Sequence, residues 1–81
     1  MGVDISELYG KRILTLGGKI LGNVKGVMLN LDESRVSHLL LDDVQNFIRN
    51  PDTKAHFLKN SVSFKRVRKI SESIVVSENE E

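Results

Sequence analysis

The two histidines, His38 and His56, are the residues of this chain most suited to catalysis or metal binding. Nucleophilic and acid–base catalysis need a base held beside a nucleophile or an orienting group. Neither histidine has such a partner at a matching spacing, and the chain contains no cysteine. Asp42 and Asp43 are adjacent, but neighbouring strand residues point to opposite faces, so shared acid–base work or chelation is not expected. We therefore predict no catalytic, cofactor or metal site, and a protein that is not an enzyme.

Gly17, Gly18 and Lys19 have the composition of a phosphate-binding loop. Such a loop is followed by a helix whose N-terminal amides hold the phosphate. Residues 20–31 follow here, and they have the apolar pattern of a strand. Because glycine adopts positive φ without steric cost, the segment is interpreted as a hairpin turn.

Basic residues gather toward the C-terminal end, and no acidic residue lies between positions 53 and 71. Their cations could bind nucleic-acid phosphates, and Phe64 could stack on a base. The same cations could instead form a solvated edge that prevents strand-to-strand aggregation. Because the net charge is only +1, nucleic acid is the second choice of partner. The cluster consists of Lys59, Lys65, Arg66, Arg68 and Lys69.

The elements that position these residues are mainly strands. Half-apolar runs at 11–16, 20–31 and 36–42 predict three strands, joined by turns at 17–19 and 32–35. Inside 20–31 the apolar residues lie first at even positions, up to Val24, and then at odd positions, from Val27. In a regular strand this change would turn them to the other face of the sheet. A bulge or sharp coil is therefore predicted near Gly26.

The strand expected at 36–42 has apolar residues at both even and odd positions, which face opposite sides of a sheet. Two interpretations are open. Either the strand is central and buried on both faces, or Leu39 and Leu41 form an exposed strip that another subunit covers.

The remaining segments are short. Residues 4–9 predict a helical turn capped by Asp4 and ended by Gly10. Residues 43–60 are the least regular connection, with a helical turn expected at 53–58. Strands are expected at 61–64 and 73–77, separated by a tight turn that contains Val67 and Ile70.

Together these patterns predict a mostly β fold, a small antiparallel barrel with one or two short helical turns. We expect residues 1–77 to form one domain and residues 78–81 to form an acidic, disordered tail. With 81 residues the core is thin, and neither disulfides nor a metal reinforce it, so self-association is expected. No apolar run approaches the roughly 20 residues that cross a bilayer. We expect a cytoplasmic protein with no direct membrane insertion.

Several segments of the sequence, in the same order along the chain, resemble those of a PRC-barrel domain. This is the small β-barrel of the photosynthetic reaction centre H subunit and of the ribosome-maturation protein RimM. The similarity lies in residues 7–13 (ELYGKRI), 18–24 (GKILGNV), 27–31 (VMLNL), 36–40 (VSHLL), 62–70 (VSFKRVRKI) and 73–76 (SIVV). The single-domain form is similar to the short, stand-alone PRC-barrel proteins of archaea.

The resemblance implies a non-enzymatic adaptor that binds another protein and forms a homodimer. Some of the archaeal relatives act in FtsZ-based cell division by binding the membrane-tethering protein SepF. The similarity to RimM implies an alternative, an RNA- or ribosome-associated binding module. The partner or dimer interface is expected on the third strand and in the long connection, at Leu39, Leu41, Phe47 and Phe57.

Overall fold

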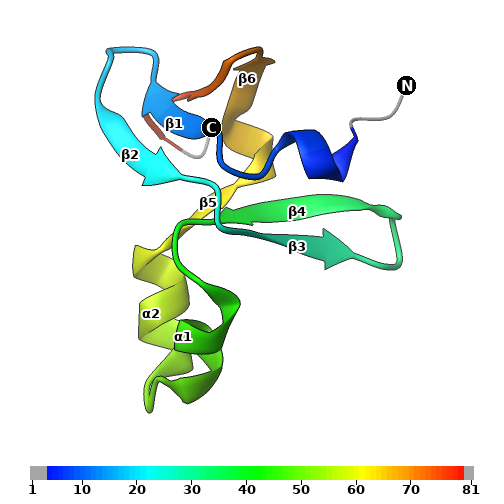
Figure 1. Cartoon of the computed structure of the whole chain (residues 1–81), viewed down its shortest axis with the longest axis vertical. Helices are drawn as coiled ribbons and strands as arrows, with labels where there is room; N and C mark the ends of the chain where they lie inside the picture. Colours follow the sequence, from blue (N-terminus) through cyan, green and yellow to red (C-terminus); the bar gives the residue numbers. More distant parts are fainter. Residues whose placement is uncertain (1–3, 80–81) are drawn as a thin grey trace.

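The computed structural model describes residues 4–79, which form seven strands, two α-helices and two 3₁₀ helices (Figure 1). The strands make two open sheets that share one core. The first sheet has the order β2-β1-β7-β6 and the second the order β3-β4-β5. The elements are η1 (Ile5–Glu7), β1 (Arg12–Thr15), β2 (Ile20–Asn23), β3 (Gly26–Asn30), β4 (Arg35–Leu40), α1 (Val44–Arg49), α2 (Thr53–Lys59), β5 (Ser61–Ser63), η2 (Phe64–Arg66), β6 (Val67–Ile70) and β7 (Ser73–Val76).

The mostly β fold is confirmed, but the sheets are not wholly antiparallel. β1 and β7 pair in parallel, with Arg12 opposite Ser73 and Thr15 opposite Val76. These two strands are the first and the last in the chain, so the whole domain serves as their connection. That long connection permits a parallel pairing, which a short hairpin could not.

The predicted single strand over 20–31 is wrong, because it is divided between β2 in the first sheet and β3 in the second. The predicted change of direction near Gly26 is confirmed. A Cβ atom at Gly26 would lie 3.1 Å from Leu40 Cδ1 and 3.3 Å from Val44 Cγ2. Glycine therefore allows β4 and α1 to approach the start of β3 closely.

The predicted turns also form. Gly18 has a φ of +93°, and Asp4 caps η1 by accepting a hydrogen bond from the Ser6 amide at 3.0 Å. Leu8, just after η1, is fully buried, so this element closes one side of the core. Val67 and Ile70 differ from the prediction, since they begin and end strand β6 and the tight turn lies earlier, at η2.

The core lies between the two sheets. Its fully buried side chains come from both sheets and from the N-terminal turn: Leu8, Ile13, Leu39, Ile74 and Val76. β4 is the central strand of its sheet, and Leu39 and Leu40 are buried on its opposite faces. Of the two interpretations of this strand, the one in which it is central and buried on both faces is confirmed, and the exposed strip of Leu39 and Leu41 is wrong. Leu39 pairs with Val62 of β5, and both side chains belong to the core.

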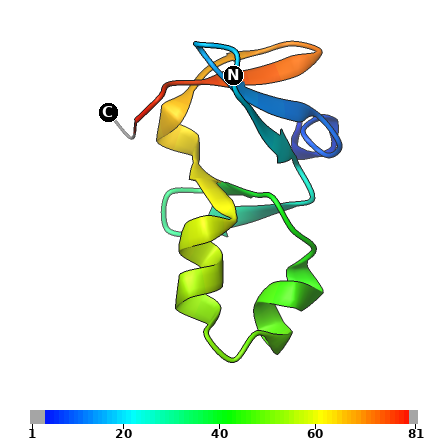
Figure 2. The same cartoon turned by 90° about the vertical axis from the view of Figure 1, so that its left-hand side faces the viewer.

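The connection over 43–60 is a helical hairpin. α1 was not predicted from the sequence, whereas the helical turn expected at 53–58 is confirmed as α2. Asp52 caps α2 by accepting a hydrogen bond from the Ala55 amide at 3.0 Å. Figures 1 and 2 both show the two helices projecting from the second sheet, on the side away from the first sheet.

The predicted acidic tail is described only in part. Glu78 accepts a hydrogen bond from the Gly17 amide at 2.7 Å, which joins the end of the chain to the β1–β2 turn. Glu80 and Glu81 lie outside the described residues.

Candidate functional site

An apolar groove of about 540 Å³ opens between the second sheet and the helical hairpin. Almost all the surface that lines it is carbon. Val44 and Met28 are 49% and 40% exposed, whereas Leu40 and Phe47 are nearly buried and form the floor. The lining residues are Met28, Leu40, Val44, Phe47, Thr53, Lys54 and Phe57.

Strand geometry explains which side chains reach the groove. Successive residues of a strand point to opposite faces, so Leu39 and Leu40 cannot share a face. Leu39 points into the core, and Leu40 points toward the helices. Met28 on β3 is paired with His38 on β4, which places Met28 on the same face as Leu40. The second sheet thus packs against the core on one face and forms the groove on the other.

Two aromatic contacts hold the phenylalanines of the groove in place. The ring of Phe57 packs edge-on against His38 of β4, with centroids 4.9 Å apart. The ring of Phe47 packs in the same manner against His56 of α2, at 4.7 Å. Such edge-to-face pairs contribute about 0.5–1.5 kcal/mol beyond the burial of their area. Each histidine therefore helps to position one phenylalanine that lines the groove.

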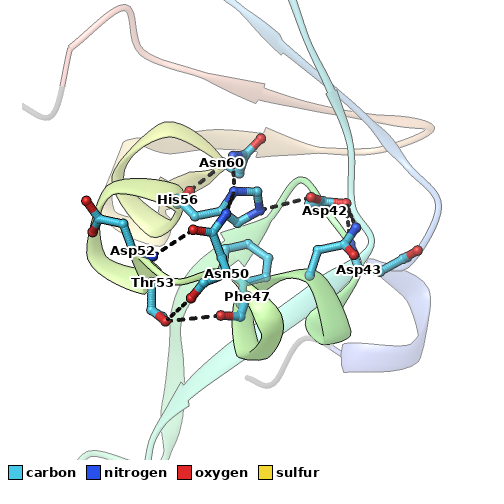
Figure 3. A network of polar contacts seen from close by, with 9 residues as sticks. Asp42, Asp43, Phe47, Asn50, Asp52, Thr53, His56 and Asn60 are labelled. Atoms are coloured by element: carbon cyan, nitrogen blue, oxygen red, sulfur yellow. Dashed lines mark hydrogen bonds and ion pairs between the residues drawn. The ribbon is translucent and has the colours of Figure 1, made fainter.

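A polar network beside the groove ties the hairpin to the end of β4 (Figure 3). His56 Nε2 lies 2.9 Å from Asp42 Oδ2, and both side chains are largely buried. Asp42 Oδ1 accepts hydrogen bonds from the Asn46 side chain and the Asp43 amide, each at 2.8 Å. One carboxylate thus holds the start of α1 and a residue of α2 together.

The amides around His56 define its tautomer. Asn50 Oδ1 accepts from the Asp52 amide at 2.8 Å, so the Asn50 NH₂ group faces His56 Nδ1 at 3.3 Å. The Asn60 NH₂ group donates to the His56 carbonyl and lies 3.3 Å from the same Nδ1. With two donors facing it, Nδ1 is the acceptor, and the proton is on Nε2, which donates to Asp42.

The hydrogen bonds also affect the acidity of Asp42. The bond from Asn46 chiefly, and then that from the Asp43 amide, lower the pKa of Asp42 below its usual value, with a smaller contribution from His56. Hydrogen bonds to a carboxylate favour its charged form. The hydrogen bonds of this network join α1, α2 and the segment that follows β4, so they stabilise the hairpin against the second sheet.

Two of the four predicted interface residues, Phe47 and Phe57, line the groove. Leu39 lies in the core, and Leu41 is half-buried and packs against the core beside Gly22. Met28, Leu40 and Val44 were not predicted from the sequence to be interface residues. Val44 and Phe47 are three residues apart, the helical spacing that places both on one face, and this was the signal available for α1.

The predicted basic cluster lies on α2, η2 and β6, and its arginines donate hydrogen bonds to backbone carbonyls. Arg66 donates two hydrogen bonds to the Ser77 carbonyl, at 3.1 and 2.7 Å, and Arg68 donates to the Lys65 carbonyl at 2.9 Å. Phe64, the proposed stacking residue, is half-buried against the core. Lys59, Lys65 and Lys69 are exposed, on α2, η2 and β6 respectively.

Within residues 4–79, no group of three or more His, Asp or Glu side chains is arranged to hold a metal ion. Neither α-helix of this described part has the length or apolar character needed to cross a membrane.

Two small sheets around a thin core, with a carbon-lined groove on one face, define a small β-rich domain of the binding type. The family model of the PRC-barrel domain matches residues 1–81, and the chain belongs to that family. A search with this sequence among curated proteins found no match.

Proposed function

We propose that this protein is a non-enzymatic adaptor that binds another protein through the groove. The observation that carries the proposal is the exposure of Met28 and Val44 above a floor of Leu40 and Phe47. Apolar side chains grouped in a concave surface gain free energy when a partner covers them, about 25 cal/mol per Å² of apolar area. Burial of one partner Leu or Phe side chain contributes about 1.5–3 kcal/mol by the same effect.

The occupant of the groove is a segment of a partner protein that carries apolar side chains next to a carboxylate. None of the seven lining residues, all in the described part of the chain, is acidic, and Lys54 is the one cation among them. The Lys54 stem lines the groove, so its ammonium group reaches the rim, where a partner carboxylate would meet it. Such a rim charge contributes more to orientation and association rate than to affinity.

For the partner itself we propose SepF, in archaeal FtsZ-based cell division in the cytoplasm, with the adaptor acting as a homodimer. Support for this comes from the resemblance of the chain to the short PRC-barrel proteins of archaea. Membership of the PRC-barrel family is compatible with it.

The direct test is titration of the isotope-labelled protein with purified SepF, followed by NMR. We expect shift changes at the lining residues of the groove. Val44→Asp places a charge in the groove and should weaken binding at least about tenfold, the effect of losing 1.4 kcal/mol. Leu58→Asp is the matched control, because Leu58 is an exposed apolar residue on α2 that does not line the groove.

Equal binding by the Val44→Asp and Leu58→Asp variants would refute the groove as the binding site. Binding to ribosomal particles instead of SepF, lost at high salt and in a Lys65→Ala/Lys69→Ala double variant, would favour the RNA-binding alternative.

A further inference from the structure

The outer edge of β3 is the least protected sheet edge in the described part of the molecule. β3 pairs with β4 on one side only. Its sequence, Gly26–Asn30, contains no charged residue and no proline, and Leu31 immediately after it is 82% exposed. An uncovered apolar edge presents unpaired backbone groups and readily accepts another strand. Proteins usually block such edges with lysine, proline or very short strands.

The other three edge strands of the two sheets are blocked in these ways. β6 carries Arg68 and Lys69, and β5 has only three residues before the chain turns into η2. β2 has only four residues, and its pairing with β1 shifts register next to Gly22, which has a φ of +149°. β2 also lies between Lys19 and Lys25, so antiparallel pairing of two copies about Gly22 would place these lysines opposite each other.

β3, unlike β2, has charges of opposite sign at its two ends. Lys25 precedes the strand, and Asp32 and Glu33 follow it. In an antiparallel pair of two β3 strands, Lys25 of each copy would lie at the acidic end of the other. Residues 31–34 turn toward β4, and Glu33 lies 2.7 Å from Arg35, so Asp32 is the carboxylate that Lys25 of the other copy would approach. A parallel pair would bring like charges together, which is unfavourable.

We propose that a second copy of this chain pairs with β3 in antiparallel fashion, with the two-fold axis at Met28 or Leu29. Val44 of α1 covers the Gly26 end of the strand, so the later residues are those open to pairing. The dimer then has one continuous sheet with three strands from each copy. This pairing gives the interface of the homodimer named in the proposed function. It does not depend on which partner the groove binds.

The pairing has a consequence for the groove. A two-fold axis between adjacent antiparallel strands is perpendicular to the sheet, so equivalent side chains lie on the same face. Met28 lines the groove at the β3 edge. The grooves of the two copies therefore lie on one face of the dimer, next to each other, and suit a partner that is itself dimeric. Two linked binding events strengthen overall binding by about 10²–10⁴-fold when the geometry allows both.

Disulfide cross-linking tests the pairing directly, because the chain has no cysteine of its own. Directly opposed residues in an antiparallel pair point to the same face, so the axis must pass through a residue. Only the residue on the two-fold axis lies directly opposite the same residue of the second chain. A cysteine there, and at no other position, has the Cα–Cα separation of about 4.4–6.8 Å that a disulfide requires. We expect Met28→Cys or Leu29→Cys, but not both, to form the covalent dimer about tenfold faster than any other position.

The controls are Leu31→Cys and Ile20→Cys. Both side chains are more exposed than Met28 or Leu29, at 82% and 58%. Leu31 lies too far from the axis to meet its own copy, and Ile20 lies on the β2 edge. Fast cross-linking at Leu31, at Ile20 or at all positions equally would overturn the proposal, as would a monomer at every concentration in light scattering.

A charge exchange gives a second measurement on the intact fold. Lys25→Glu should weaken the dimer, and Lys25→Glu combined with Asp32→Lys should restore it. No restoration would contradict the antiparallel arrangement. A monomer that still binds SepF through the groove would remove this inference and leave the adaptor function. A wild-type dimer that binds no partner would remove the adaptor function and leave this inference.

Discussion

Truncation of Leu39 to alanine is the sharpest test of how the second sheet is arranged. Leu39 is fully buried between the sheets and pairs with Val62, itself in the core. Leu→Ala substitutions at such positions cost about 2.7–5 kcal/mol, the transfer free energy of the lost atoms plus the cavity that remains. Leu31 is the matched control, since it is 82% exposed and the same substitution there should cost less than about 0.5 kcal/mol.

The expected loss is large compared with the stability of the whole domain. At about 0.05–0.15 kcal/mol per residue, a chain of this size has a free energy of unfolding of about 4–12 kcal/mol. Urea denaturation followed by circular dichroism measures the change. With a slope near 1 kcal/mol/M, the midpoint should fall by about 3–5 M, or the variant should already be unfolded in buffer. A Leu39→Ala variant as stable as Leu31→Ala, and altered only in association, would refute the core position of Leu39.

Three further predictions concern the hairpin and a turn. His56→Ala removes a donor to Asp42 and the edge-on ring contact with Phe47, and the lost ring contact alone should lower the free energy of unfolding by about 0.5–1.5 kcal/mol, with faster amide exchange across α1 and α2. Because the folded pKa of Asp42 is lowered, its contribution is present above the unfolded pKa of 3.8 and is lost as the pH falls through the folded value. In acid titrations Asp42→Asn should therefore show a smaller loss of stability below about pH 4 than the wild type. Gly18→Ala forces a positive φ on alanine and should cost about 1 kcal/mol in thermal or urea unfolding.

Local chemistry decided the parts of the fold that the sequence predicts well. Gly18 and Asp4 satisfy or permit particular backbone conformations whatever surrounds them, so the β1–β2 turn and the cap of η1 were predictable. The parity change before Gly26 was likewise visible in the sequence, although it separates two strands where one was predicted. The residue before Pro51 is extended, as the proline ring requires.

The candidate groove was predictable only in part. Phe47 and Phe57 were identified because large aromatic side chains in an irregular connection need a surface to pack on. The ring contacts of these phenylalanines with His38 and His56 were not predicted, because contacts between distant segments leave no local pattern in the sequence. The sequence also gave α1 no clear signal, because six residues are too short for helical periodicity to stand out.

By itself, then, the sequence determined a small β-rich chain, the positions of its turns and its membership of the PRC-barrel family. Only the tertiary structure decided which face of β4 meets the core. Both faces of that strand are apolar, and local patterns are the same whether Leu39 or Leu40 points inward. The choice depends on what each face packs against: the first sheet for Leu39 and the helical hairpin for Leu40.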